Sequence, residues 1–253
     1  MSLETKLVLI TGAARRVGRE LALAVARAGG DVVIHYGSSQ NEAESLGLEI
    51  EALDRKAFLL QADLNDPSQV SNLIPQASEH GQLFALVNNA AIFENLSWQS
   101  STLEAWNQNL MVNLTTPFLL SQAFARLLPT DGTGRIVNLL DWRALRPGAD
   151  HLPYTISKSA LAALTLSLAV ALAPRISVNG LALGAVLPPV TKLDSATGGT
   201  PTDNIAPPNI LKNVPANRWA HLDEVGQALI FLLDGPAYIT GEIIHIDGGR
   251  HLV

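Results

Sequence analysis

The chain has 253 residues, of which 47% are hydrophobic and 16% are charged, a balance that supports a large core and argues against disorder. The formal net charge of −6 argues against a nucleic-acid groove, which needs clustered Lys and Arg. Cysteine is absent, so disulfides, zinc–thiolate sites and cysteine nucleophiles are excluded. The first apolar run covers only residues 7–10, too short for a signal or membrane segment. We therefore expect a cytoplasmic protein with neither a nucleic-acid nor a membrane partner.

Short β-rich runs alternate with longer helical patterns along the whole chain. Strands are expected at residues 6–11, 31–36, 57–61, 83–88, 134–140, 176–181 and 242–246, and helices at 18–28, 42–54, 68–79, 103–128, 155–172 and 222–233. Several strand runs are continuously apolar, which is typical of parallel strands covered on both faces. The alternation predicts one α/β domain, residues 1–253, built on a doubly wound parallel sheet.

The first strand leads into the turn "TGAARRVG" and then into a helix. Gly12 and Gly18 let the backbone approach a pyrophosphate, and the N-terminus of the helix favours an anion. Taken alone, such a turn is equally consistent with ordinary strand–helix chemistry. The second strand ends in "HYGSS", without the carboxylate that would grip a ribose 2′-hydroxyl. Arg15 and Arg16 in the turn suit a 2′-phosphate, which favours NADP(H) over NAD(H) unless both are solvated surface charges.

Tyr154 and Lys158 are four residues apart in "PYTISK" and lie on one face of a predicted helix. A lysine ammonium near a phenol favours the phenolate and lowers the tyrosine pKa toward working pH. By itself this pair is better explained as part of an amphipathic helix with a surface lysine. The run that follows, residues 160–172, is apolar nearly all round, which predicts burial against a partner subunit.

The glycine turn, "NNAA" at residues 88–91, Asn113 in the next helix, YxxxK and "YITGEIIHIDGG" near the end occur in one order. Together they resemble the short-chain dehydrogenase/reductase family from end to end. The resemblance implies a single Rossmann-type domain with a seven-stranded sheet, usually a homotetramer, and hydride transfer from a nicotinamide. It implies that Tyr154 donates a proton, that Lys158 holds the ribose and that Asn113 holds a relay water.

The same resemblance places the cofactor along the carboxyl edge of the sheet. Asp63 resembles the family's adenine contact, while Asn89 and Ala90 line the cofactor channel. The positions expected to contact NADPH are Gly12, Arg15, Arg16, Val17, Gly18, His35, Tyr36, Ser38, Asp63, Leu64, Asn89, Ala90, Ala91, Tyr154, Lys158, Gly184 and Val186.

One position departs from the family pattern. The family usually has a serine about thirteen residues before the tyrosine, and this chain has Asp141 there. A hydroxyl can donate a hydrogen bond to a carbonyl oxygen, whereas an ionised carboxylate only accepts. Asp141 would also raise the Tyr154 pKa, opposing Lys158. Unless Asp141 is protonated, it is better suited to a substrate that carries N–H groups, or that is reduced at a C=N bond, than to a ketone substrate. A surface-loop residue and a degenerate enzyme remain alternatives.

Within the family, an aspartate at this place resembles the pteridine reductases and the bacterial dihydromonapterin reductases. "TGAARRVG" and "HYGSS" agree with them, and Phe93 in "NNAAIF" could stack on a flat heterocycle, with plain packing as the alternative. We expect Asp141, Tyr154, Lys158 and Asn113 to be catalytic, Phe93, Asp141, Tyr154 and Leu187 to contact substrate, and no metal. The prediction is an NADPH-dependent reductase of a pteridine or similar nitrogen heterocycle. A general carbonyl or 3-oxoacyl thioester reductase and an NADP(H)-binding sensor with little turnover stay open.

Two further segments carry expectations. Residues 187–215 are rich in Pro, Thr, Asn and Gly and follow the sixth strand, which predicts a substrate lid. The chain closes with "HIDGGRHLV", in which Gly248 and Gly249 permit a sharp turn. We predict an ordered tail that offers Arg250 to a pocket and buries its last two residues, Leu252 and Val253.

Overall fold

The computed structural model describes residues 3–187 and 211–253. Seven parallel strands form one sheet in the order β3-β2-β1-β4-β5-β6-β7. The strands are β1 (Leu7–Ile10), β2 (Asp31–Tyr36), β3 (Ala57–Gln61), β4 (Leu83–Asn88), β5 (Gly134–Asp141), β6 (Ile176–Leu183) and β7 (Ile243–Ile246). The order reverses between β1 and β4, where ligands of doubly wound sheets bind. The predicted fold class is confirmed.

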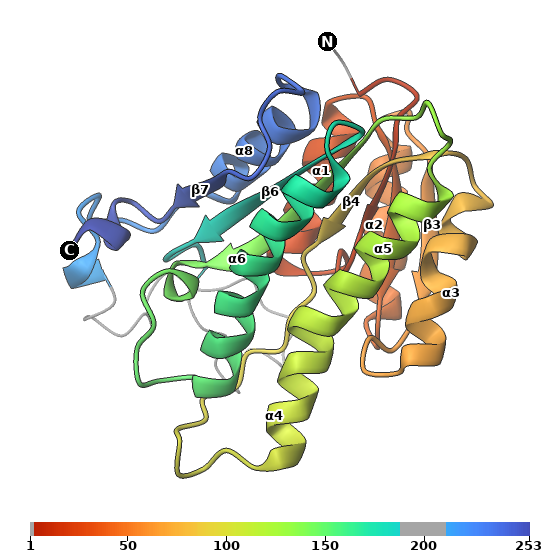
Figure 1. The fold of residues 1–253 in the computed structure, drawn as a ribbon. Coiled ribbons are helices and arrows are strands. Elements are labelled where there is room, and N and C mark those ends of the chain that lie inside the picture. The colour runs from red at the N-terminus through yellow and green to blue at the C-terminus, as the bar shows by residue number, and fades with distance from the viewer. Residues whose placement is uncertain (1–2, 188–210) are drawn as a thin grey trace.

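Helices cover both faces of the sheet (Figure 1). One layer holds α1 (Arg16–Arg27), α2 (Gln40–Glu51) and α8 (Leu222–Asp234), and the other holds α3 (Pro67–Ser78), α5 (Thr116–Leu127) and α6 (Leu152–Leu172). In β1, Val8 and Ile10 pack against the first layer, while Leu7 and Leu9 pack against the second. All four side chains are buried, which explains why this strand reads as an unbroken apolar run.

The helix predicted over residues 103–128 is divided into three parts. α4 (Leu103–Leu110) is followed by a π-helical turn, Met111–Thr115, and then by α5. Pro117 has no backbone N–H to donate to the carbonyl of Asn113, four residues earlier, so the α-helical ladder is interrupted there. Single π turns often lie at functional sites, and this one contains Asn113.

In the described part of the chain, α6 is the one helix long and apolar enough to span a membrane. Its inner face, however, carries Lys158, Ser157 and Thr165, all buried and hydrogen-bonded inside the protein. These contacts identify α6 as a core helix packed on β5 and β6. Val170 on its outer face is 83% exposed in the single chain, so the expected burial of this face against a partner subunit stays a prediction.

The C-terminal tail is ordered, as predicted. Gly248 and Gly249 have φ values of +62° and +84°, which only glycine adopts readily. The buried carboxylate of Asp247 accepts hydrogen bonds from the backbone N–H groups of Gly249 and His251. The Arg250 guanidinium lies 4.0 Å from the centroid of the Trp142 ring.

The burial predicted for the last two side chains is not found. Leu252 is 74% exposed and Val253 is 60% exposed in the single chain. Polar contacts hold this segment instead: Arg146 donates to the backbone oxygens of His251 and Val253. The tail is therefore fixed by its backbone and by Arg250, and its apolar side chains point outward.

Deleting residues 250–253 is expected to lower the free energy of unfolding by about 1–2 kcal/mol, because the Arg250–Trp142 contact and the Arg146 bonds are lost. That corresponds to roughly 2–8 °C in Tm, measured by calorimetry. Activity is expected to fall as well, because Trp142 follows Asp141 directly. Leu252→Ser, which alters only an exposed side chain, is the control. A truncated enzyme with unchanged Tm and full activity would contradict this prediction.

Most of the predicted substrate lid lies outside the described residues. At its edges, Leu187 is half-buried, and a 3-10 turn at Leu211–Asn213 leads to the buried Val214. The lid over residues 187–215 stays a prediction.

Candidate active site

Hydrogen bonds join the turn after β1 to the segment that follows β4. The two strands are neighbours in the sheet, at the point where the strand order reverses. The Thr11 hydroxyl accepts hydrogen bonds from the backbone N–H groups of Asn89 and Ala90, each at 3.0 Å. The Asn89 side chain donates back to the carbonyls of Thr11 and Gly12 at 2.8 and 3.1 Å. Asn89 thus braces the glycine turn, and Thr11, which the sequence analysis did not single out, is its partner.

The two glycines of the turn leave no room for side chains. A Cβ on Gly18 would lie 2.2 Å from the Gly12 carbonyl oxygen, and one on Gly12 would lie 3.0 Å from Ala90 Cα. Bare backbone therefore faces the start of α1, as a phosphate cradle requires. Arg16 has a φ of +54°, a conformation that costs a residue with a side chain about 1–2 kcal/mol. A strained non-glycine residue held in such a turn points to a functional role.

A cavity of about 650 Å³ opens beside this turn. Seven of the predicted cofactor positions line it: Gly12, His35, Ser38, Asp63, Leu64, Ala90 and Ala91. The cavity continues past Ile92 to Gln108 and Val112, so it runs from the turn toward the π-helical segment. The carboxyl edge of the sheet therefore offers an elongated site with a phosphate cradle along one wall. The bare backbone of the turn and the mixed polar and apolar lining of the cavity fit a dinucleotide.

Two of the predicted cofactor positions, His35 and Gly184, make contacts within the protein that stabilise the fold around the site. Both ring nitrogens of His35 are engaged within the chain, since Nδ1 accepts from the Gly12 N–H at 3.0 Å and Nε2 lies 3.1 Å from the Ala62 oxygen. Burial lowers the pKa of His35 to about 4, so the ring is neutral and braces the turn. A Cβ on Gly184 would lie 2.6 Å from Asp247 Cα, so Gly184 allows the ends of β6 and β7 to meet.

Arg15 lies at the other end of the cradle. Its exposed guanidinium donates to the Ser39 hydroxyl at 2.6 Å and lies 3.3 Å from the Glu42 carboxylate. Ser38, the neighbour of Ser39, lines the cavity. The Arg15 guanidinium and the serine hydroxyls therefore lie close together, at the place where the sequence predicts that a 2′-phosphate is bound.

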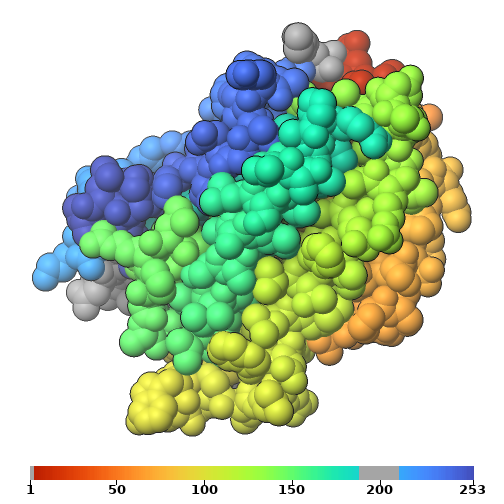
Figure 2. Space-filling model, in the orientation of Figure 1, coloured from red at the N-terminus to blue at the C-terminus, as the bar shows by residue number. Residues whose placement is uncertain are grey.

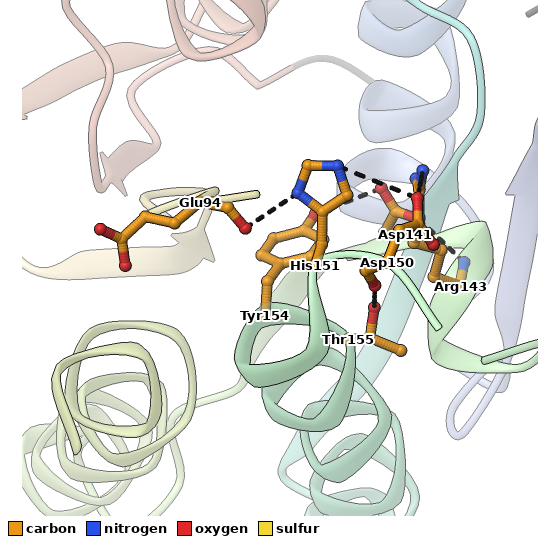
Figure 3. A network of polar contacts seen from close by, with 7 residues as sticks. All are labelled: Glu94, Asp141, Arg143, Asp150, His151, Tyr154 and Thr155. Atoms are coloured by element: carbon orange, nitrogen blue, oxygen red, sulfur yellow. Dashed lines mark hydrogen bonds and ion pairs between the residues drawn. The ribbon is translucent and has the colours of Figure 1, made fainter. Parts of the chain in front are cut away.

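Asp141 and Tyr154 meet at the carboxyl end of β5 (Figure 3). The Tyr154 hydroxyl donates to Asp141 Oδ2 at 3.2 Å. Lys158, one turn further along α6, donates from Nζ to the Leu139 carbonyl at 2.6 Å and lies 5.9 Å from the centroid of the Tyr154 ring. The structure thus brings three of the predicted catalytic residues together at one strand end.

The expected lowering of the Tyr154 pKa toward working pH is not found. Burial raises the pKa of Tyr154 well above its ordinary range, and the charge and hydrogen bond of Asp141 raise it further. Burial also lowers the pKa of Lys158 to about 8, against the opposing effect of Asp141. Desolvation disfavours both charged forms, so Tyr154 is held as a neutral phenol, which can donate a proton.

Asn113 connects the π-helical turn to the rest of the site. Its side-chain oxygen accepts from the Ile92 N–H at 2.9 Å, and its amide nitrogen donates to the Ile92 oxygen at 3.0 Å and to Ser157 Oγ at 3.1 Å. Ser157 in turn donates to the Tyr154 carbonyl at 2.6 Å. The side chain thus positions the segment after β4 against α6, and its role with a relay water stays a prediction.

Phe93 lies directly beside the phenol of Tyr154. Its ring stacks on His151 at a centroid distance of 4.0 Å and meets Tyr154 edge-on at 4.6 Å. The ring is 55% exposed, so one face is covered by His151 while part of the ring remains accessible. His151 Nδ1 also lies 2.9 Å from the Glu94 carbonyl, which ties this segment to the start of α6 (Figure 3).

A family model described as short chain dehydrogenase matches residues 6–197. The chain belongs to the short-chain dehydrogenase family. A 3-oxoacyl-[acyl-carrier-protein] reductase from Synechocystis sp. is 31% identical over 98% of each chain. A 2-dehydro-3-deoxy-D-gluconate 5-dehydrogenase from Bacillus subtilis is 33% identical over 98% of this chain and 95% of its own. This short-chain dehydrogenase is therefore an NAD(P)-dependent oxidoreductase.

A solved structure with the same fold is FolM alternative dihydrofolate reductase 1 from Brucella canis, complexed with NADP. It is 33% identical to this short-chain dehydrogenase, with a TM-score of 0.87 over 100% of this chain and 97% of the other. The blue fluorescent protein from a metagenomic library, in complex with NADPH, is 32% identical, with a TM-score of 0.87 over 99% of each chain. Both likenesses extend over essentially the whole chain.

Three residues of this short-chain dehydrogenase site had no distinct sequence signal. Thr11 is visible only as the residue before the first glycine, and Ser157 only as the residue before Lys158. Arg143 follows Asp141 by two positions, and only the structure places its guanidinium against that carboxylate.

Proposed function

We propose that the protein is an NADPH-dependent reductase of a pteridine or a similar nitrogen heterocycle. The contact between Asp141 Oδ2 and the Tyr154 hydroxyl carries this proposal. A carboxylate at this place accepts N–H groups of a ring and leaves a neutral phenol beside it as the proton source. The likeness to FolM alternative dihydrofolate reductase 1 supports it.

The residues present fit NADPH. Gly12 and the start of α1 would hold the pyrophosphate, Arg15 and Ser38 the 2′-phosphate, and Asp63 the adenine. Lys158 and Tyr154 would hold the nicotinamide ribose. When bound, NADPH supplies the hydride. The NADP held by the Brucella canis protein supports the choice of cofactor.

The chain's own residues would supply the proton and the orientation. In reduction of a C=N bond, the carbon takes the hydride and the nitrogen takes a proton, which Tyr154 delivers from its hydroxyl. Asp141 orients the ring by accepting a hydrogen bond from a neighbouring N–H. Phe93, edge-on to Tyr154 and 55% exposed, offers an aromatic surface for a flat heterocycle. Lys158, buried in the same helix, stabilises the charge left on the phenolate.

A second candidate is a 3-oxoacyl thioester reductase, because a 3-oxoacyl-[acyl-carrier-protein] reductase is 31% identical over nearly the whole chain. Asp141 weighs against it, since an ionised carboxylate cannot donate to a keto oxygen.

NADPH oxidation by the purified protein separates the candidates when dihydrobiopterin, dihydromonapterin and an acetoacetyl thioester are compared. We expect turnover of a pterin. Turnover of the thioester alone would support the carbonyl reductase, and NADPH binding without turnover of any substrate would support a sensor.

We propose that the protein is a homotetramer and that the exposed apolar face of α5 and α6 is one of its interfaces. The two helices lie side by side on the face shown in Figure 2. The exposed large apolar side chains of these two helices are Phe118 and Leu127 of α5 and Ile156, Leu166 and Val170 of α6. Large apolar side chains exposed on two neighbouring helices are the kind of surface that a protein partner covers. Light scattering coupled to size exclusion would give the subunit number.

A further inference from the structure

Arg143 is a nearly buried cation that the proposed reaction does not yet use. Its side chain is 15% exposed and lies between two carboxylates. Nη1 is 3.5 Å from Asp141 Oδ1, and Nη2 donates to Asp150 Oδ2 at 2.9 Å. Removing a guanidinium from water is unfavourable unless partners of opposite charge compensate. Its placement against Asp141 therefore indicates that the charge serves the site.

The two carboxylate oxygens of Asp141 have different partners, one facing Arg143 and the other facing Tyr154. The backbone N–H of Arg143 donates to Oδ1 at 2.8 Å, and its guanidinium faces the same oxygen. Oδ2 is left to the Tyr154 hydroxyl (Figure 3). Because both contacts with Arg143 involve one oxygen, rotation of the carboxylate would break them. The second oxygen is thereby kept toward Tyr154.

The same side chain also touches the aromatic part of the site. The guanidinium carbon lies 4.9 Å from the centroid of the Trp142 ring and 5.9 Å from that of the Phe93 ring. Asp150, the anchor of Arg143, directly precedes His151, which stacks on Phe93. One cation therefore links the carboxylate, the loop before α6 and the exposed aromatic ring.

We propose that Arg143 is the positioning residue of this site: it fixes Asp141 as an acceptor and holds Phe93 beside it, and so makes the pocket selective for flat rings that present N–H donors. The inference rests on the proposed function and names a residue that sets its substrate class. Arg143 also opposes the effect of Asp141 on the phenol, since its charge lowers the Tyr154 pKa while burial and Asp141 raise it. The other ionisable groups around this cluster include Lys158, Asp150, His151 and Arg250, whose guanidinium lies over the Trp142 ring.

Kinetics with a dihydropterin test the positioning role. Arg143→Gln is expected to lower kcat/KM roughly 30-fold, the effect of losing a hydrogen-bonded charge beside a carboxylate. Arg143→Lys keeps the positive charge but lacks the planar guanidinium that can contact two carboxylates at once. Its kcat/KM is therefore expected to lie between those of Arg143→Gln and the parent. Asp150→Asn leaves the guanidinium in place and removes only its anchor, so a smaller loss is expected; it serves as the test if Arg143→Gln does not fold. NADPH affinity is expected to stay unchanged in all three variants.

A substrate-free measurement separates this inference from the proposed function. With fluorotyrosine incorporated, the ¹⁹F signal missing from Tyr154→Phe identifies Tyr154, and its titration can be followed in each variant. The Tyr154 signal is expected to titrate at higher pH in Arg143→Gln than in the parent, and at lower pH in Asp141→Asn. A parent that reduces no pterin would end the proposed function, and the ¹⁹F titration would still decide the effect of Arg143. An unchanged titration in Arg143→Gln, or a variant with full pterin activity, would overturn the inference.

Discussion

Replacing Asp141 with asparagine is expected to lower kcat/KM for a dihydropterin by about 100-fold or more. The side chain keeps its size but loses its charge and exchanges one acceptor oxygen for an NH₂ donor. The substitution alters the 3.2 Å contact with the Tyr154 hydroxyl. It also alters the oxygen that would accept a hydrogen bond from an N–H of the substrate ring. Because Asp141 is not among the residues that line the cofactor cavity, NADPH binding is expected to persist, which a fluorescence titration would measure.

Asp141→Ser is the matched variant, because it places at this position the residue type that the family usually has. Without the negative charge, the pKa of Tyr154 is expected to fall, since Asp141 contributes to raising it. Turnover of an acetoacetyl thioester is expected to rise while pterin turnover falls. If Asp141→Asn reduced pterins at the parent rate, the carboxylate would have no role in the reaction and the proposed function would be wrong.

Lys158→Met is expected to remove activity and yet to make the fold more stable. General-acid contributions of 10²–10⁴-fold set the scale of the rate loss. The buried ammonium has its pKa lowered from 10.5 to about 8, a difference of roughly 3 kcal/mol between its charge states. Losing the hydrogen bond to the Leu139 carbonyl offsets about half of this. A net gain of about 1 kcal/mol, or roughly 2–4 °C in Tm at pH 7, is therefore expected.

The pH dependence of the parent supplies an independent check on the same residue. Between about pH 8 and pH 10.5 the unfolded chain holds a proton on Lys158 that the folded chain has lost. The contribution of Lys158 to stability therefore rises with pH over this interval. The rate is expected to move the other way, falling above about pH 8 as the ammonium loses its proton. Denaturant unfolding of parent and Lys158→Met at pH 7 and pH 10 isolates this contribution. A stability difference that does not change with pH would contradict the prediction.

The sequence by itself determined the sheet, the glycine turn and the proximity of Tyr154 and Lys158. Local periodicity was sufficient for the strands because parallel strands buried on both faces, such as β1, leave an unbroken apolar run. Gly12 and Gly18 could be identified because only a residue without a side chain fits that turn. Tyr154 and Lys158 share one helix face at a fixed spacing, so their proximity needed no tertiary information.

The tertiary structure alone decided how those residues behave. The sequence indicated that Asp141 raises the Tyr154 pKa, but burial is the larger cause and follows only from the fold. The spacing of Tyr154 and Lys158 therefore gave the wrong direction for the shift. Asn113, in the π-helical turn at Met111–Thr115, pairs with Ile92 in the segment after β4, a contact that the sequence pattern does not encode. Arg143 joins Asp141 to Asp150 across a loop, a contact that no periodicity encodes. Charge effects and close contacts act through space, so the residues that tune this site became visible only once the chain was folded.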